Sequence, residues 1–293
     1  MMKETYNVIA DEKELEWFFN HVIQKPNINE SYLACFVCRH KKLTDEEKLT
    51  IGLSRRNAEF LAHQSFRLNS KQEWKFRNFL QTLKRFEVNK EAYVTENDLP
   101  LPEKCLVTLL YVNPSDDIKV CERFVAEYNE NCEAIIKAHM AQKDIPSCLT
   151  GYRWFTNASN RIKHLQANVK GSRYWLDYDI DVPKWFKEKY YEHLCNVFTD
   201  RFGKGNYVIV DTSGGYHVLV RTTSIYNNPH DVCKDVQDIY NLALTQGEEP
   251  YVNEKGECKF ECVINDSQIP GLPLPGTYQY GRPVTVLNKE DFE

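Results

Sequence analysis

The spacing of apolar residues predicts helices over much of the first third of the chain. Apolar positions recur every three or four residues over residues 11–23 and 72–86, the period of a helix with one buried face. The segment TDEEK begins at Thr44 and has the pattern of a capped helix start, in which Glu47 completes the cap. Residues 116–139 continue the helical period over a longer stretch. We therefore expect a largely helical N-terminal part.

Short apolar runs bounded by turn residues predict strands, most of them in the second half of the chain. Strands are expected over residues 32–39, 106–112, 174–180, 207–210, 216–221, 260–264 and 283–287. The helical period returns between them, over residues 185–202 and 229–244. A strand, a helix, a hairpin, a helix and further strands in this order indicate an α+β fold.

The composition is that of a soluble globular protein, because 42% of the residues are hydrophobic and 27% are charged. The longest apolar stretch, residues 105–112, is too short for a bilayer, which requires about 20 apolar residues. The first residues are acidic and lack the basic and apolar regions of a secretory signal. We therefore expect a cytoplasmic protein without a membrane partner.

The chain contains 10 cysteines, which we expect to be reduced thiols in a cytoplasmic protein of this size. Two closely spaced pairs could contribute to a zinc site, namely Cys35 with Cys38 and Cys258 with Cys262. Residues 32–39 are better explained as a buried strand, in which cysteine serves as a small apolar residue. Zinc is therefore not expected.

Positive charge is concentrated in two segments, although the net charge of the whole chain is −5. Residues 67–90 contain seven basic and two acidic residues. Residues 148–176 contain no acidic residue and five basic ones, which are Arg153, Arg161, Lys163, Lys170 and Arg173. Basic side chains attract phosphate backbones, and the aromatic residues nearby can stack on bases, so both segments are candidates for nucleic-acid binding. The alternative is a solvated face above aromatic residues of the core.

The segment YWLDYDID, residues 174–181, carries the sharpest candidate for chemistry. Residues two apart in a strand point to the same face, so Asp177 and Asp179 are expected to project together. Neighbouring carboxylates repel each other unless a cation lies between them, and Mg²⁺ prefers such oxygen ligands. In nucleotidyl transfer, two ions about 4 Å apart can activate the attacking hydroxyl and stabilise the leaving pyrophosphate. Asp181 is expected to end the strand. Surface carboxylates or a helix cap are the alternative.

Two further features lie downstream of this strand. Ser213, Gly214 and Gly215 form a predicted turn whose amides and hydroxyl could hold a phosphate. His217 begins the next strand, where its ring could hydrogen-bond a phosphate oxygen; the alternative is an ordinary hairpin with a packed histidine. Asp266 follows an apolar run and could supply a third carboxylate just beyond a strand end. On its own, it would be an aspartate in a loop.

The order and spacing of these motifs resemble the archaeo-eukaryotic primase superfamily, which includes primase-polymerases of plasmids, phages and CRISPR loci. That family carries a DxD or DxE strand, a Ser-x-His-type motif and a lone aspartate after an apolar strand. Asp177 and Asp179 match the first motif, and SGGYH, residues 213–217, matches the second. Asp266 is the candidate for the third. The segment PGTYQYGRPV, residues 275–284, is similar to the family's sequence after that motif.

One position departs from the family pattern. Many relatives have a basic residue just before the PGT sequence, where this chain has Leu272, Pro273 and Leu274. Arg221 or Arg282 could supply the corresponding charge to an incoming nucleotide.

The resemblance implies an RRM-like catalytic core over residues 105–293, packed on a mixed α/β N-terminal subdomain, with a mostly helical extension over residues 1–104. It implies a primase-polymerase that makes RNA or DNA primers on a single-stranded DNA template in a bacterial or phage-infected cell. Two Mg²⁺ or Mn²⁺ ions would be held by Asp177, Asp179 and Asp266. An NTP or dNTP would be bound by Ser213, Gly214, Gly215, His217, Arg221 and Arg282. The basic segments would follow the template, and a helicase or further polymerase would be a separate chain.

Other functions remain open. DYDID is similar to the DxDxD loop of double-psi-barrel RNA polymerases, but their catalytic subunits are much longer. A nuclease or a terminal transferase could use the same carboxylates, because hydrolysis and transfer share the metal chemistry. An inactive relative could serve as a nucleic-acid-binding accessory in replication or defence.

Overall fold

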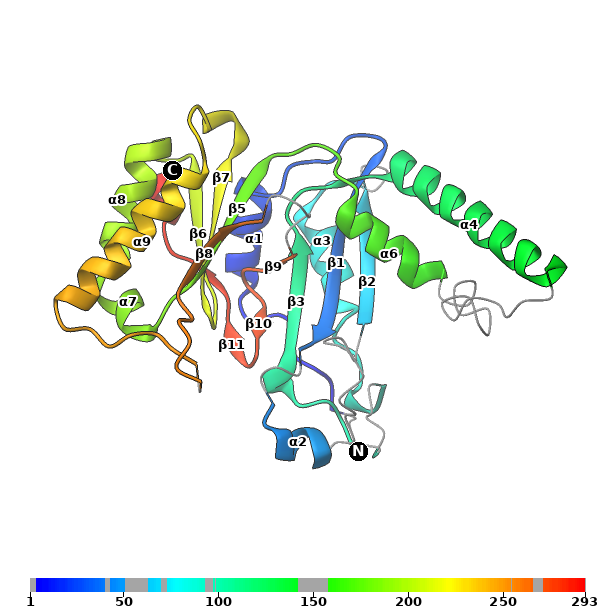
Figure 1. Ribbon diagram of the computed structural model, residues 1–293, viewed down its shortest axis with the longest axis horizontal. Helices are drawn as coiled ribbons and strands as arrows, with labels where there is room; N and C mark the ends of the chain where they lie inside the picture. Colours follow the sequence, from blue (N-terminus) through cyan, green and yellow to red (C-terminus); the bar gives the residue numbers. More distant parts are fainter. Residues whose placement is uncertain are drawn as a thin grey trace.

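The computed structural model describes residues 4–39, 43–50, 63–69, 73–92, 97, 99–141, 158–253, 255–265 and 271–292. These residues form an α+β fold with two antiparallel sheets, which we call sheet A and sheet B (Figure 1). Helices lie outside both sheets, and one helix lies between them.

Sheet A contains strands from both ends of the chain. Its strands are β1 (Glu30–Cys38), β2 (His63–Asn69), β3 (Leu106–Tyr111), β4 (Ser115–Asp116), β9 (Gly271–Pro273), β10 (Tyr278–Gln279) and β11 (Arg282–Pro283). The order is β11-β10-β3-β1-β2, with β4 paired to β1 and β9 paired to β3. Residues on either side of position 105 therefore share one sheet.

β1 is buried along its whole length, as its continuous apolar run predicts. Its residues alternate between the two faces of sheet A. Phe36 and Cys38 lie in the largest core of the protein, whereas Leu33 and Cys35 belong to a separate cluster on the opposite face. Cys35 and Cys38 consequently point to different sides of the sheet.

Sheet B carries the motifs singled out in the sequence. Its strands are β5 (Trp175–Asp181), β6 (Tyr207–Asp211), β7 (Gly215–Arg221), β8 (Glu261–Ile264) and β12 (Thr285–Val286). They are arranged in the order β12-β6-β7-β5-β8, so the DxD strand is paired on one side with the strand of His217.

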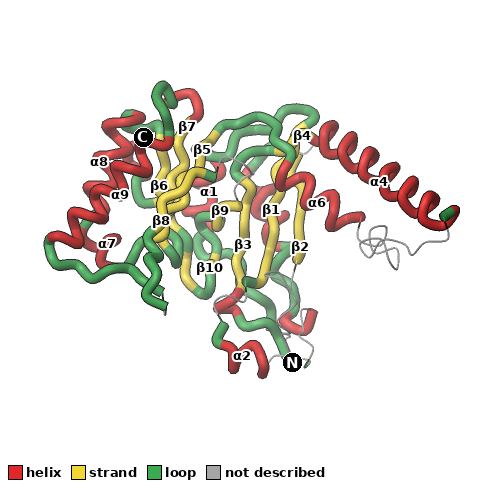
Figure 2. Tube along the Cα trace, in the orientation of Figure 1, coloured by secondary structure: helices red, strands yellow, loops and turns green. Residues whose placement is uncertain are grey.

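The helices have the following bounds: α1 (Glu12–His21), α2 (Asp45–Thr50), α3 (Phe76–Lys84), α4 (Asp117–Met140), α6 (Ala158–Asn168), α7 (Lys184–Lys189), α8 (Tyr191–Phe202) and α9 (His230–Thr245). α7, α8 and α9 form a layer over one face of sheet B (Figure 2). α4 and α6 lie beyond the other sheet and contact each other. Within the described residues, no helix is long and apolar enough to cross a membrane.

The two faces of sheet B have different roles. Tyr178 and Ile180 of β5 point into the core beneath the helix layer, together with Phe198 of α8. The alternate residue Trp175 lies in the largest core, which also contains residues of α1 and of sheet A. Its indole nitrogen donates to the carbonyl of Val22 at 2.9 Å. Asp177 and Asp179 share the face of Trp175.

The structure confirms one of the predicted local features and divides two of the predicted elements. The predicted capping box is present, because Thr44 and Glu47 exchange hydrogen bonds at 2.8 and 3.2 Å. The helix expected over 185–202 is divided at Tyr190, where the backbone leaves the helical region. The strand expected over 283–287 is divided between the sheets. Pro283 pairs within sheet A, whereas Thr285 and Val286 pair with β6 of sheet B.

Candidate metal and nucleotide site

The pairing of β5 with β7 brings two aspartates and one histidine onto the same face of sheet B. Asp179 lies directly opposite His217, and Asp177 lies opposite Leu219, so His217 is diagonal to Asp177. Side chains in these relative positions are within reach of each other across an antiparallel pair. The sequence predicts the shared face of the two aspartates, and the pairing with β7 adds the histidine.

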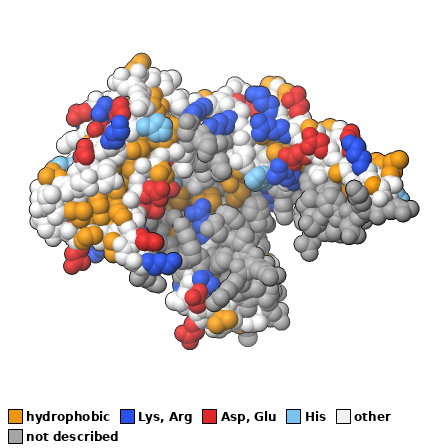
Figure 3. Space-filling view, viewed as in Figure 1, with side chains coloured by type: hydrophobic (Ala, Val, Ile, Leu, Met, Phe, Trp, Pro, Cys, Tyr) orange, Lys and Arg blue, Asp and Glu red, His pale blue; other side chains and the backbone are white. Residues whose placement is uncertain are grey.

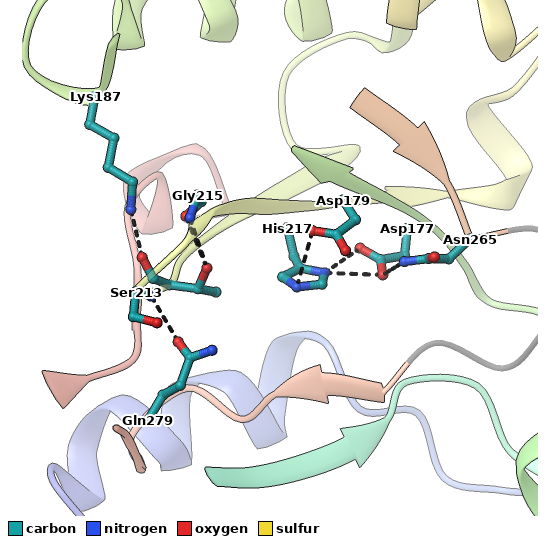
Figure 4. Close-up of polar contacts among 9 residues, drawn as sticks. Asp177, Asp179, Lys187, Ser213, Gly215, His217, Asn265 and Gln279 are labelled. Carbon is teal, nitrogen blue, oxygen red and sulfur yellow. Dashed lines mark hydrogen bonds and ion pairs between the residues drawn. The ribbon is translucent and has the colours of Figure 1, made fainter. Parts of the chain in front are cut away.

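The histidine ring lies between the two carboxylates (Figure 4). Nδ1 of His217 lies 3.1 Å from both carboxylate oxygens of Asp177. Nε2 lies 3.6 Å from Oδ1 of Asp179. The Asp177 side chain is completely buried, whereas that of Asp179 is 42% exposed. The site thus has a closed end at Asp177 and an open end at Asp179.

A third strand supports the closed end. Asn265 directly follows β8, and its side-chain amide donates to Oδ2 of Asp177 at 2.8 Å. Its backbone N–H donates to the carbonyl of Asp177 at 2.9 Å. A buried carboxylate needs such donors, because a charge without partners is expensive in an apolar environment. Sequence reasoning missed Asn265, since its contact depends on the register between β5 and β8.

The charges of the site hold His217 in its protonated form. Burial lowers the pKa of the imidazole, but the neighbouring carboxylates of Asp177 and Asp179 outweigh this effect and raise it to about 9. The positive charge of Arg39 lowers the pKa of His217, as burial does. At neutral pH an imidazolium therefore lies against two carboxylates.

The donor set suits a hard divalent cation only in part. Asp177 and Asp179 offer carboxylate oxygens on one face, which Mg²⁺ and Mn²⁺ prefer. The described residues contain no group of three or more His, Cys, Asp or Glu side chains that could hold a metal ion. The predicted third ligand, Asp266, lies outside the described residues. Asp181 ends β5 and is exposed beside the turn of β6 and β7.

The predicted phosphate turn connects β6 to β7 at the end of the sheet next to Asp181. Gly215 pairs with Asp181, and a Cβ atom on Gly215 would lie 1.9 Å from the carbonyl oxygen of Ile180. Only glycine fits there, since a backbone oxygen at that distance cannot be moved aside by a side-chain rotation. Gly214 is less confined, because its Cβ would meet the Asp181 carboxylate at 3.2 Å.

Ser213 has the environment of a ligand-binding residue. Its backbone N–H donates to Oε1 of Gln279 at 2.8 Å, a contact that joins the turn of sheet B to β10 of sheet A (Figure 4). Its hydroxyl oxygen is buried and has no hydrogen-bond partner among the described residues. Buried hydroxyls nearly always have a partner, so this one is available to a bound molecule. Lys187 supports the turn from the other side through the carbonyl of Thr212 at 2.6 Å.

The two arginines proposed from sequence lie in different places. Arg221 is four residues from His217 on β7, roughly 13 Å along the strand. Its guanidinium lies 5.4 Å from the ring centre of Trp175 and 5.7 Å from that of Phe292, so it is held by aromatic rings. Arg282 is exposed on β11, opposite Gln279. The structure therefore does not bring Arg221 to the histidine.

The basic segment before β5 is also only partly described. Arg153 lies outside the described residues. Arg161 of α6 forms a two-pronged ion pair with Glu127 of α4, and acidic and basic side chains are interspersed over these helices in Figure 3. Burial raises the pKa of Cys35 to about 12, and the positive charge of Lys163 opposes this shift. The backbone of Lys170 forms an isolated antiparallel β-bridge with that of Ser115. The carbonyl of Arg173 accepts a hydrogen bond from the hydroxyl of Thr222.

Comparisons of the chain with protein-family models, with curated proteins and with solved structures find no match. The geometry of the site and the sequence motifs are therefore what indicates the function. Sequence reasoning missed Gln279 as well as Asn265. Both contact the motifs across segments that are distant in sequence, and no local pattern marks them.

Proposed function

We propose that this protein is a template-directed nucleotidyltransferase, a primase-polymerase that makes RNA or DNA primers. One observation supports this most strongly: Asp177, Asp179 and His217 converge on one face of sheet B, beside a glycine turn that carries the buried hydroxyl of Ser213. A carboxylate pair can hold the metal ions of nucleotidyl transfer, and an imidazolium and a turn with free donors can stabilise phosphate charge.

Each group has a role in this proposal. Asp177 and Asp179, with Asp266, would hold Mg²⁺ or Mn²⁺. Bound there, the ions would activate the attacking hydroxyl and neutralise charge on the leaving pyrophosphate. His217 is protonated at neutral pH and can donate a hydrogen bond to a phosphate oxygen. The hydroxyl of Ser213 and the amides of the turn would hold further phosphate oxygens.

The fold is compatible with this activity. The resemblance to the archaeo-eukaryotic primase superfamily implies an RRM-like core, and sheet B with helices on one face is the part that we assign to it. The template would be single-stranded DNA, bound by the basic residues before β5, and the substrates would be NTPs or dNTPs. Unwinding and further extension would require a separate helicase or polymerase.

The test is synthesis on a single-stranded DNA template with NTPs or dNTPs and Mn²⁺, with and without a primer. Wild type is expected to extend or initiate strands, and Asp179→Asn to be inactive. Asp179 is the suitable ligand to change because its side chain is partly exposed, so the fold should survive. Asp181→Asn, on the same face of β5, is the matched control and should keep most of the activity. Absence of product from wild type under every condition would refute the proposal.

A second candidate follows from the closed end of the site. Asp177 is fully buried, and both its oxygens already accept from His217 or Asn265. If these contacts persist in the presence of metal, the protein would be an inactive nucleic-acid-binding accessory. The same assay separates the candidates, since an accessory would bind the template and make no product. A nuclease would shorten the template, and Asp179→Asn would prevent this.

A further inference from the structure

Helix α4 is the longest helix of the described residues, and it buries little of its own surface. It contains 24 residues, a length of about 36 Å at the usual helical rise. All of these residues are described, and Val120 is the only buried one. Figure 1 shows the helix extending away from both sheets. Helices in proteins are stabilised mainly by packing of an apolar face, so most of α4 has little support from the rest of the chain.

The support that α4 does receive comes from α6 and is confined to one side of the helix. Val120 and Phe124 pack with Ile162 and Leu165 of α6. Glu127 lies on the same side, three residues after Phe124, and forms an ion pair with Arg161 of α6.

A different side of α4 carries an exposed apolar stripe. Its residues follow one another at alternating intervals of three and four, as Ile118, Cys121, Val125, Tyr128, Cys132 and Ile135. This is the heptad spacing of a helix that packs lengthwise against another helix. Ile118, Val125 and Tyr128 are 50, 54 and 41% exposed, and Cys121 is exposed as well. The stripe is therefore accessible from the first turn of the helix, and contiguous apolar surface of this kind marks an interaction site.

The stripe is complementary to itself when two copies run antiparallel. With Val125 of one copy opposite Tyr128 of the other, each layer of the helix pair contains apolar side chains and no charge. The layers are Ile118 with Ile135, Cys121 with Cys132 and Val125 with Tyr128, and two-fold symmetry repeats each of them. A second copy of this chain therefore fits the stripe without any further partner.

The position of the sheets favours the antiparallel arrangement. β4 directly precedes α4 and pairs with β1, so sheet A adjoins the N-terminal end of the helix. In a parallel helix pair, the sheets of both copies would compete for the space at the same end. In an antiparallel pair they lie at opposite ends, and the apolar stripes can come together.

We propose that α4 docks antiparallel on α4 of a second copy, with Ile118, Val125 and Tyr128 at the centre of a two-fold interface. The interface is distinct from the candidate site on sheet B, so the inference is independent of the proposed function.

The first experiment measures the oligomeric state of the full chain by sedimentation over a range of protein concentrations. Wild type is expected to form a concentration-dependent dimer. Val125→Glu should raise the dimer dissociation constant roughly tenfold or more, because each dimer would bury two unpaired charges. Ala126→Glu is the matched control, since it adds the same charge at the next, exposed residue outside the stripe and should dimerise as wild type does. Urea unfolding should show equal stability for the two variants under monomeric conditions.

The second experiment uses the native cysteines of the stripe. Diamide takes up two electrons and two protons as a pair of thiols forms a disulfide. It should join Cys121 of one copy to Cys132 of the other, and peptide mass spectrometry identifies the bond. Cys121→Ser should prevent it.

Each result bears on the interface. A wild type that stays monomeric at every concentration would overturn the proposal, and a partner of another kind would then cover the stripe. Equal dimerisation of Val125→Glu and wild type would also overturn it, as would equal losses in Val125→Glu and Ala126→Glu. Disulfides that join Cys121 to Cys121 would show a parallel pair and refute the antiparallel arrangement.

Discussion

His217 lies between Asp177 and Asp179, with Nδ1 3.1 Å from both oxygens of the first and Nε2 3.6 Å from Oδ1 of the second. The protonated ring offsets part of the repulsion between the two carboxylates. A metal ion bound by the same carboxylates would face this positive charge. A triphosphate that accepts the hydrogen bond of the ring would remove the conflict, so metal and nucleotide are expected to bind together.

This relationship predicts opposite effects for His217→Gln on the two ligands. Removal of the positive ring should strengthen Mn²⁺ binding severalfold in the absence of nucleotide, because like charges repel at close range. The same change should weaken triphosphate binding about tenfold, as loss of a charged hydrogen bond does. Calorimetric titrations with Mn²⁺ alone and with the nucleotide check both signs. Weaker metal binding in the variant would mean that His217 supports the metal and does not compete with it.

Asn265 should behave as an outer partner of the metal site. In Asn265→Ala, the buried Asp177 carboxylate loses the side-chain donor at 2.8 Å and keeps the backbone contact. Loss of such a partner typically lowers metal affinity or activity by about 10- to 100-fold. The free energy of unfolding should fall by roughly 1.5–3 kcal/mol, the range for hydrogen bonds to charged groups. Strand synthesis and urea unfolding measure the two effects. An active variant of wild-type stability would leave Asn265 without a role.

The shared face of Asp177 and Asp179 could be predicted because it depends only on the two-residue period of a strand. The register between strands could not be predicted from the sequence. The diagonal contact of His217 with Asp177 and the contact of Asn265 with Asp177 are therefore known only from the structure. The contact of Gln279 with Ser213 could not be predicted for the same reason, since the two residues are 66 positions apart in the sequence.

The fold was predictable to a similar depth. The sequence indicates an α+β protein, and the structure has that class. It does not indicate β2, whose only large apolar residues are Phe66 and Leu68 on either side of a charged Arg67. Nor does it indicate that Pro283 and Thr285, two residues apart, pair in different sheets. Such assignments depend on long-range packing that local periodicity does not encode.

The close packing of Gly215 against β5 predicts that a larger residue at this position lowers the stability of the protein. In Gly215→Ala the new methyl group would lie 1.9 Å from the carbonyl oxygen of Ile180, and β5 and β7 would have to separate locally. The free energy of unfolding should fall by about 3 kcal/mol or more, at or above the usual upper range for overpacking. Gly214→Ala is the matched control, because its methyl group would meet only the movable carboxylate of Asp181 at 3.2 Å. Urea unfolding of both variants should separate them clearly, and equal stability would contradict the tight pairing at Gly215.

The proposed binding of template by the basic residues before β5 predicts a dependence on salt concentration. Neutralising Lys163, Lys170 and Arg173 to Gln should weaken binding of single-stranded DNA and leave nucleotide binding unchanged. The slope of log affinity against log salt should fall by about 2, since each lost phosphate contact contributes about 0.7. The control has the same change in charge at exposed lysines near the helix layer, namely Lys184, Lys204 and Lys234. Binding titrations between low and moderate salt measure both slopes. If both triple variants lose the same slope, attraction would come from overall charge, and the segment before β5 would not be the template site.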